Sequence, residues 1–299
     1  MVKGLTGLSA FPLTPMNEAD IDEAAYRGLI KRLATSGVDS ICALGSTGSY
    51  PYLTREERAR VISLTRESAS DIPVLAGIGA LRTKDVLLLA EDAQKLGVDG
   101  VLLAPVSYQL LTDAEVLGLF KAVDSMLSVP LIVYNNPRTT RFDFSNDLLA
   151  EISQLASVRS IKIPAVSLDF SVAQDRITQL RSVIAPDVSI GVSGDASAAI
   201  GLTAGCDAWY SVIGGLFPET ALAITRAAQG SEPEEALKLS DQLHTLWTLF
   251  AQHGALRVVA AAAELLGFAQ QNCLPLPLRS LSGEPRNVLQ QVLQTLDLQ

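Results

Sequence analysis

Residues 131–163 read LIVYNNPRTTRFDFSNDLLAEISQLASVRSIKI, in which two short apolar runs enclose a longer stretch of mixed character. These runs, Leu131–Tyr134 and Ser160–Ile163, are about thirty residues apart and mostly apolar on both faces, as in parallel strands that helices cover. The same alternation recurs along the chain. It predicts strands at Gly7–Phe11, Ser40–Ala43, Val74–Ile78, Gly100–Leu103, Leu131–Tyr134, Ser160–Ile163, Val188–Gly191 and Ala208–Val212.

The stretches between these runs carry helix signals. Thr54–Glu57 and Thr112–Glu115 each place a hydroxyl three residues before a carboxylate, the pattern of a capping box. Glycines 37, 97 and 205 stand between a helical pattern and a strand, where a left-handed residue ends a helix. Eight strand–helix units are the number that closes a barrel, so the α/β fold class predicted is a (β/α)8 TIM barrel. An open doubly wound sheet is the alternative.

The last quarter of the chain contains helical patterns only. They lie at Glu219–Gly230, Pro233–Gln252, Leu256–Leu266 and Glu284–Leu298. We therefore expect a barrel over residues 1–225 and a C-terminal helical segment, residues 226–299, packed on it.

Composition narrows the functional classes. Of 299 residues 48% are hydrophobic, the net charge is −9, and lysine and arginine form no cluster, so neither nucleic-acid binding nor disorder is expected. No apolar run reaches the roughly 18 residues that span a bilayer. Cys42, Cys206 and Cys273 have unrelated spacings, which is typical of free thiols in a reducing compartment. A soluble, cytoplasmic protein without a membrane or nucleic-acid partner is predicted.

Histidine is scarce. His244 and His253 are the only two, and both lie near the C-terminus, so a His-rich metal site or a Ser-His-Asp triad in the body of the chain is not expected. The chemistry must use lysine, tyrosine, carboxylates, hydroxyls or the backbone.

Lys162 is the only one of seven lysines that falls within a strand-like run. Period-two alternation directs Ile161 and Ile163 toward the helices and Lys162 toward the barrel interior. One interpretation is a strand-end lysine that reaches water. The other is a desolvated amine of lowered pKa that forms a Schiff base with a carbonyl.

Two further motifs follow neighbouring strands. Tyr134 ends one strand, where it is either a rim residue or a proton relay for a nucleophilic lysine. Gly45–Ser49, GSTGS, lacks the ending of a P-loop, and is either a plain turn or a pair of hydroxyls that bind a small carboxylate.

Glycine-rich loops at Gly191–Asp195 and Ser211–Gly215 follow the seventh and eighth strands. Loops in these two places form the phosphate site of some barrels. They favour a phosphosugar-type TIM-barrel enzyme as an alternative function.

Several motifs coincide in order with one family. The motifs are Pro12–Pro15 (PLTP), Gly45–Gly48 (GSTG), Tyr134–Pro137 (YNNP), Ile161-Lys162 and Ser193–Asp195 (SGD). Through them the chain resembles the dihydrodipicolinate synthase / N-acetylneuraminate lyase family of pyruvate-dependent class I aldolases. The resemblance implies an eight-stranded barrel with a helical extension, a homotetramer built as a dimer of dimers, no metal and no dissociable cofactor.

Site residues follow from the same resemblance. It implies that Lys162 forms the Schiff base and that Tyr134 relays protons. Ser46 and Thr47 would hold the pyruvate carboxylate, with Thr47 also orienting Tyr134. Gly194 and the backbone near Tyr210 would face the bound oxo acid.

The chain departs from the family pattern where the second substrate binds. Ser107 stands where relatives carry a relay tyrosine. Either Tyr108, one residue later, enters the relay through a shifted loop, or the relay is incomplete. Thr139 stands at the family's arginine position, with Arg138 and Arg141 on either side. One of these two arginines is expected to bind substrate, and Arg138 is the first candidate.

Two smaller departures concern the loops around the pyruvate site. Ser49 and Ile163-Pro164 replace glutamates that are usual in the family.

The predicted function is therefore a class I aldolase or lyase that acts on pyruvate or a 2-oxo acid together with an aldehyde. The acceptor aldehyde is left open. Two alternatives remain, the phosphosugar-type enzyme and a non-catalytic paralogue that senses oxo acids.

Overall fold

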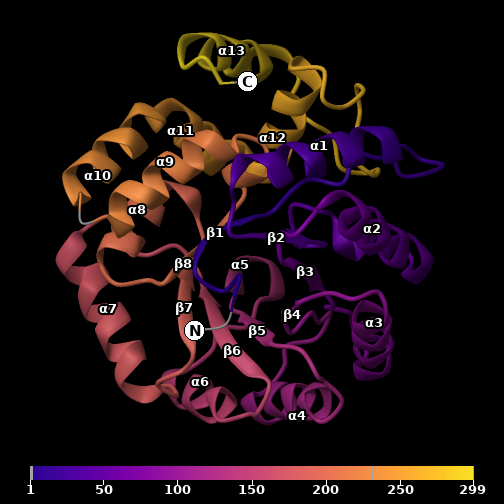
Figure 1. Ribbon diagram of the computed structural model, residues 1–299, viewed down its shortest axis with the longest axis vertical. Helices are drawn as coiled ribbons and strands as arrows, with labels where there is room; N and C mark the ends of the chain where they lie inside the picture. Colours follow the sequence, from indigo (N-terminus) through magenta and orange to yellow (C-terminus); the bar gives the residue numbers. More distant parts are fainter. Residues whose placement is uncertain (1–2, 231, 299) are drawn as a thin grey trace.

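A computed structural model describes residues 3–230 and 232–298, in which eight parallel strands close into a barrel in chain order (Figure 1). Each strand pairs with its neighbours in the chain, and β8 pairs with β1. The strands are β1 (Gly7–Ala10), β2 (Ser40–Ala43), β3 (Val74–Gly77), β4 (Gly100–Leu103), β5 (Leu131–Tyr134), β6 (Val158–Ile163), β7 (Ser189–Val192) and β8 (Ala208–Ser211). The predicted fold class and all eight strands are confirmed, with bounds that shift by at most two residues.

Helices surround the barrel on its outside, except α5, which Figure 1 shows within the outline of the strands. They are α1 (Glu23–Ser36), α2 (Arg55–Ser68), α3 (Thr83–Lys95), α4 (Asp113–Asp124), α5 (Pro137–Thr140), α6 (Asn146–Ser153), α7 (Phe170–Val183), α8 (Ala198–Thr203), α9 (Pro218–Gln229), α10 (Pro233–Gln242), α11 (His244–His253), α12 (Ala255–Leu265) and α13 (Gly283–Thr295). Short 3-10 turns are η1 (Tyr50–Tyr52), η2 (Asp195–Ser197) and η3 (Ile213–Gly215).

Local signals set the helix ends as the sequence predicts. The Thr54 hydroxyl accepts from the Glu57 amide at the start of α2, and the Glu57 carboxylate accepts from the Thr54 amide. Thr112 and Glu115 form the same capping box on α4. Gly37 ends α1 with a φ of 89°, which a residue without a Cβ adopts at little cost.

One predicted helix is wrong. The pattern Pro233–Gln252 predicts a single helix, but the structure divides it at Leu243 into α10 and α11. The Ser240 carbonyl accepts one hydrogen bond from the Leu243 amide, in a 3-10 turn, and a second from the Trp247 indole. Because of these two bonds, the α-helical hydrogen-bond pattern does not continue through Leu243. The expected division at residue 225 falls inside α9, and the separation into two parts stays a prediction.

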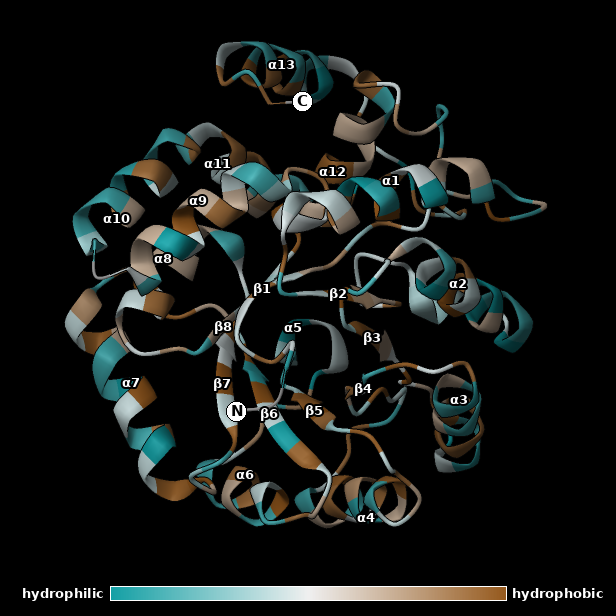
Figure 2. Cartoon of the chain, in the orientation of Figure 1, coloured by the Kyte–Doolittle hydropathy of each residue, from teal (hydrophilic) through white to brown (hydrophobic). Residues whose placement is uncertain are grey.

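The strand residues divide between two apolar layers. Leu8, Ile161 and Ile163 belong to the larger layer between the strands and the helices. A smaller cluster fills the barrel interior, namely Leu5, Phe11, Cys42, Leu75, Leu102, Ala104, Ile132, Tyr134, Ala208 and Tyr210. In β6, hydrophilic and hydrophobic residues alternate along the strand (Figure 2). The two sets of side chains therefore point to opposite faces of the closed sheet.

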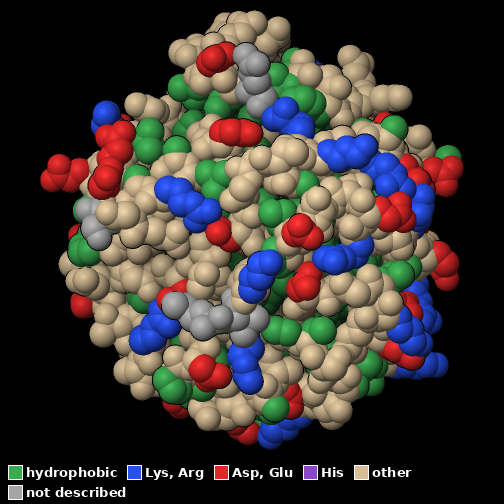
Figure 3. Space-filling view, viewed as in Figure 1, with side chains coloured by type: hydrophobic (Ala, Val, Ile, Leu, Met, Phe, Trp, Pro, Cys, Tyr) green, Lys and Arg blue, Asp and Glu red, His purple; other side chains and the backbone are tan. Residues whose placement is uncertain are grey.

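Surface charge and membrane features are unremarkable in the part that is described. On the face shown in Figure 3, basic and acidic side chains are intermixed and do not gather in one patch of a single sign. No helix within residues 3–230 and 232–298 is long and apolar enough to cross a membrane.

The loop after β2 depends on a glycine in β3. Leu44 has a φ of 58°, a left-handed conformation that is rare for a bulky residue. This conformation brings the Leu44 carbonyl against Gly77, where an added Cβ would lie 1.9 Å from the carbonyl oxygen. A side chain at residue 77 therefore requires the loop to move.

We expect Gly77→Ala to lower the free energy of unfolding by about 2 kcal/mol, because overpacking against backbone has no flexible neighbour to relieve it. The matched control is Gly118→Ala in α4, where an added Cβ meets nothing within 4 Å. That change should stabilise by about 0.5–1 kcal/mol, the usual gain for alanine in a helix. Urea unfolding of both variants measures the difference, and equal effects of the same sign would contradict the analysis.

Candidate active site

Lys162 and Tyr134 lie side by side at the carboxyl ends of β6 and β5. Their Cα atoms are partners in the parallel register of the two strands. Lys162 is 4% exposed and Tyr134 is 7% exposed, although both carry polar atoms. Lys162 points into the barrel, as the alternation predicts, and does not reach out to water. The carboxyl ends of barrel strands are where this fold places its functional groups.

Aromatic rings surround the amine of Lys162. Its Nζ lies 3.8 Å from the ring centroid of Phe11, 4.2 Å from that of Tyr134 and 5.6 Å from that of Tyr210. The sequence analysis missed Phe11. A signal was present, because the alternation that turns Leu8 and Ala10 outward turns residue 11 inward at the end of the same run.

Burial lowers the pKa of Lys162 to about 8, because the barrel interior disfavours the charged form. The Cys42 thiol and the Asp195 carboxyl act in the opposite direction. Across the described chain, Nζ has no hydrogen bond and no ion pair. A useful fraction of this amine is therefore uncharged, and able to attack a carbonyl, in mildly alkaline solution.

The Tyr134 hydroxyl is held by two side chains. It lies 3.3 Å from Ser46 Oγ and accepts a hydrogen bond of 2.9 Å from Asn136 Nδ2. Burial raises the pKa of Tyr134, and these two hydrogen bonds partly oppose that effect. The phenol therefore keeps its proton at neutral pH and has a fixed direction.

The expected contact between Thr47 and Tyr134 is corrected, since Ser46 makes it. The loop closes with the Ser49 amide donating to the Ser46 carbonyl, and this turn points adjacent side chains in different directions. Thr47 is 5% exposed, and its hydroxyl has no partner among the residues described. That leaves the Thr47 hydroxyl available to a ligand.

The loop after β7 is anchored to β8 through Asp195. Its carboxylate accepts from the Trp209 indole, the Val212 amide and the Ile213 amide, at 2.9, 3.2 and 2.7 Å. Burial raises the pKa of Asp195, and these hydrogen bonds oppose the rise. Since the Gly214 amide also donates to Ser211 Oγ, the amides of the loop after β8 are already used.

Tyr210 lies in the barrel interior near Lys162, whereas Gly194 is exposed in the loop after β7. Gly194 has a φ of 85°, and a Cβ there would lie 2.6 Å from Ala165 Cβ, so the loops after β6 and β7 approach closely. The Tyr210 hydroxyl is 2.6 Å from Ser160 Oγ. Ser160 lies two residues before Lys162 in β6 and therefore deeper in the barrel. Tyr210 thus presents its ring, and not its hydroxyl, to the amine.

The residues expected to bind the second substrate lie further out. Arg138 on α5 is exposed and makes no ion pair within the described residues. Arg141 ends α5 and donates from Nη2 to the Tyr108 carbonyl at 2.5 Å. Tyr108 is 81% exposed, and a single chain does not bring it to Lys162 and Tyr134.

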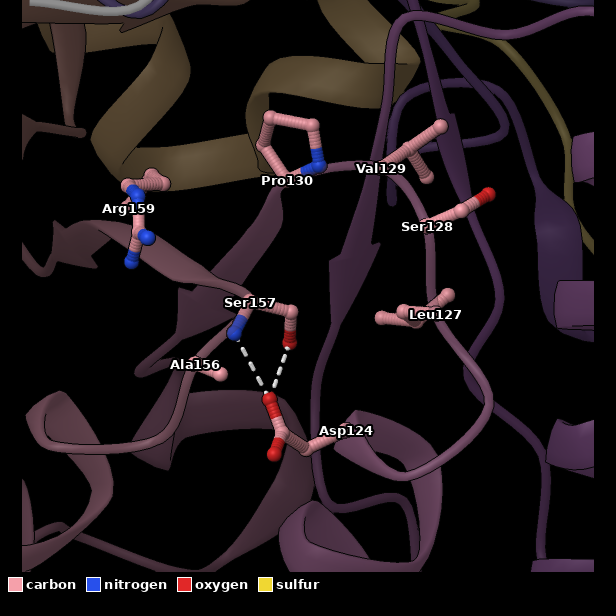
Figure 4. A pocket seen from close by; sticks show the side chains of 8 residues that line it. All are labelled: Asp124, Leu127, Ser128, Val129, Pro130, Ala156, Ser157 and Arg159. Carbon is pink, nitrogen blue, oxygen red and sulfur yellow. Dashed lines mark hydrogen bonds between the residues drawn. The ribbon is translucent and has the colours of Figure 1, made fainter.

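A separate cleft of about 240 Å³ opens at the opposite end of β5 and β6 (Figure 4). Its acidic residue, Asp124, accepts from both the amide and the hydroxyl of Ser157, as the dashed lines show. This carboxylate is already satisfied, and the cleft lies away from Lys162. In the part of the chain that is described, no group of three histidine, cysteine, aspartate or glutamate residues is arranged to hold a metal ion.

Comparisons with known proteins agree with this geometry. Residues 4–296 match the model of the "Dihydrodipicolinate synthetase family". A curated 4-hydroxy-tetrahydrodipicolinate synthase of Persephonella marina is 32% identical and covers 96% of both chains. Another, of Methylobacterium radiotolerans, is 30% identical over 88% of this chain and 87% of the relative. A crystal structure of dihydrodipicolinate synthase from Agrobacterium tumefaciens is 42% identical, covers 98% of each chain and superposes with a TM-score of 0.94.

Proposed function

The chain belongs to the dihydrodipicolinate synthetase family, and we propose that it is a class I aldolase that joins pyruvate, or another 2-oxo acid, to an aldehyde through a Schiff base on Lys162. The observation that carries this proposal is a buried amine of lowered pKa, 4.2 Å from the ring of a tyrosine whose hydroxyl is hydrogen-bonded in place. The activity named for the relatives, 4-hydroxy-tetrahydrodipicolinate synthase, is the first to test.

Schiff-base formation uses the two buried groups in turn. The uncharged Nζ of Lys162 attacks the ketone carbon, and the carbonyl oxygen becomes the hydroxyl of a carbinolamine. Nitrogen then expels this hydroxyl, which leaves as water with a proton from Tyr134. The product is a cationic iminium.

Carbon–carbon bond formation follows from the iminium charge. The charge acidifies the neighbouring C–H, whose proton returns to the Tyr134 phenolate and leaves a neutral enamine. The enamine carbon attacks the aldehyde carbon, the aldehyde oxygen takes the proton from Tyr134, and the iminium forms again. Water then hydrolyses this iminium and releases the amine together with one proton, which returns to the Tyr134 phenolate. Proton transfer of this kind contributes about 10²–10⁴ in rate.

We assign carboxylate binding to the loop after β2. Thr47 offers a buried hydroxyl that has no partner in the described chain, and Ser46 is held beside Tyr134. Gly194 and the backbone at Tyr210 are proposed to face the bound oxo acid. Thr47 is therefore proposed to bind the carboxylate, while Ser46 connects the bound oxo acid to the tyrosine.

We assign the aldehyde end to Arg138. This exposed guanidinium lies on α5, directly after the strand that carries Tyr134, and it suits an acceptor with an anionic group. Arg141 is proposed to support the Tyr108 loop, because its guanidinium already donates to that loop's backbone.

Two exposed apolar patches support a homotetramer built as a dimer of dimers. The mouth patch, Tyr52, Leu81, Tyr108 and Leu110, lies on the loops after β2, β3 and β4. The side patch, Leu168, Phe170, Val172 and Leu237, lies at the start of α7 and on α10. Large apolar side chains that are exposed on neighbouring elements are typical of contact surfaces. Tyr108 is proposed to act across the interface made by the mouth patch.

The phosphosugar alternative has less support. It needs free amides in the loop after β8, but Asp195 and Ser211 already accept from the Val212, Ile213 and Gly214 amides. The oxo-acid sensor shares the Lys162 chemistry, and only turnover separates it from the aldolase.

Incubation with pyruvate and borohydride should attach a reduced pyruvate adduct to Lys162, because hydride traps the iminium. Peptide mass mapping identifies the residue. Lys162→Met should abolish the adduct and the activity, while Lys84→Met on α3 should leave both unchanged. An unlabelled Lys162, or activity that survives Lys162→Met, overturns the aldolase. An adduct without product from any of a panel of aldehydes favours the sensor.

The corrected roles of the two adjacent hydroxyls predict different kinetic defects. Thr47→Val should raise the KM for pyruvate about tenfold, since it removes a hydrogen bond to a charged group. Ser46→Ala should chiefly lower kcat and shift the pH profile, because it removes a partner of the Tyr134 hydroxyl. Steady-state kinetics from pH 6 to about 10 compares them. The reverse pattern would return the relay role to Thr47.

Charges placed in the two patches should separate the proposed assembly in two steps. Leu168→Glu should convert tetramers into active dimers, and Leu81→Glu in the mouth patch should also disrupt the dimer and reduce kcat, because Tyr108 then lacks its partner subunit. Light scattering and sedimentation measure the mass. A wild-type monomer with full activity would rule out a role for Tyr108 across an interface.

A further inference from the structure

The amine of Lys162 is surrounded by rings where a hydrogen-bonding group would be expected. Phe11 is nearest, with its centroid 3.8 Å from Nζ, and its side chain is 2% exposed. Phe11 also meets Tyr210 edge-on, with centroids 5.9 Å apart and planes at 80°. Phe11, Tyr134 and Tyr210, which we call the aromatic box, thus approach the amine from β1, β5 and β8.

Two glycines make room for this box. A Cβ on Gly45 would lie 2.5 Å from Phe11 Cδ1, and a Cβ on Gly191 would lie 2.1 Å from Tyr210 Cε2. Both contacts are too short for any side chain, so the loop after β2 and the end of β7 are shaped around the rings. The position of Phe11 is therefore built into the fold.

No anion in the described chain pairs with Nζ. The nearest acidic influence is Asp195, whose oxygens are taken by the Trp209 indole and by two backbone amides. The other titratable groups that face Lys162 are the Cys42 thiol on β2 and the phenols of Tyr134 and Tyr210. A positive charge on this nitrogen is consequently stabilised mainly by the faces of rings, which carry negative electrostatic potential.

We propose that the aromatic box binds the cationic nitrogen of the Lys162 iminium and that Phe11, which has no proton to exchange, acts in the reaction through this electrostatic contact alone. The proposal rests on the Schiff base assigned above. The nitrogen is positive as the iminium before and after carbon–carbon bond formation, and neutral as the enamine between them. A ring face stabilises both cationic states without donating or removing a proton.

Replacing residue 11 with mono-, di- and trifluorinated phenylalanine tests the contact, because fluorine weakens the ring's negative face and nearly preserves its shape. The rate of pyruvate trapping by borohydride at Lys162, measured against pH, gives the pKa of the amine. Trapping at high pH gives the fraction of protein held as iminium. Each added fluorine should lower both, with a combined fall in the iminium equilibrium of roughly 2–30-fold.

The sign of the pKa change separates this role from packing. A loosened interior would admit water and raise the pKa of Lys162, whereas a weakened ring face lowers it. The same substitutions at Phe120, which is fully buried in α4 against Phe144, are the control and should change neither quantity.

Phe11→Leu, which keeps an apolar side chain without a ring, should reproduce the trifluorinated protein. If neither the pKa of Lys162 nor the fraction held as iminium changes as fluorines are added, or if the pKa of Lys162 rises, the aromatic box is overturned. The proposed aldolase function would still stand. Wild-type protein that forms no adduct at Lys162 overturns the proposed function itself.

Discussion

An amine without an anionic partner, enclosed in a barrel of strands, is the constraint on which the rest of the site depends. Lys162 is 4% exposed, and among the residues described nothing accepts a hydrogen bond from its Nζ. Desolvation alone would make the ammonium unfavourable at any ordinary pH. Burial lowers the pKa of Lys162 to about 8, and the Cys42 thiol and the Asp195 carboxyl offset part of this cost. The ring face of Phe11 lies against the same nitrogen. At a pH near the pKa of Lys162, both the neutral and the cationic forms of the amine are populated. An amine that alternates between the two forms during a reaction requires this.

The fold maintains that environment by dividing the strand side chains between two layers. The outer layer, which includes Ile161 and Ile163, fixes β6 against the helices. The inner cluster is smaller and changes character along the barrel axis, with Leu75 and Leu102 among its aliphatic members and Tyr134 at a strand end. Rotation of β6 would expose two isoleucines, so the direction of Lys162 is secured by packing on the opposite face. The packing of the hydrophobic core therefore determines the direction of the Lys162 side chain.

Much of this arrangement could be predicted from the chain. The strands were located closely because a barrel strand is buried on both faces, and Lys162 was identified because a lysine in such a run is unusual. What failed depended on detail that residue type does not encode. Ser46 and Thr47 are both hydroxyls, and the turn closed at Ser49 decides which one meets Tyr134. The break between α10 and α11 at Leu243 depends on the Ser240 carbonyl, which accepts from both the Leu243 amide and the Trp247 indole. The role of Tyr108 stays a prediction, because the residue is 81% exposed and a single chain does not bring it to Lys162.

The mouth of the barrel follows different constraints from its interior, and this explains where the chain departs from its relatives. Phe11, Tyr134 and Lys162 are fixed by strand packing and by glycines that leave room for the rings. The α5 segment, by contrast, is a four-residue helix that ends at Arg141 in a left-handed conformation. The Arg141 guanidinium donates to the Tyr108 backbone and so ties the exposed loop to the helix that carries Arg138. A change at this link affects the positions of Arg138 and Tyr108 together, while strand pairing holds Tyr134 beside Lys162 independently of it. The two arginines and the exposed tyrosine at the rim are therefore less firmly fixed by the fold than the buried pair is.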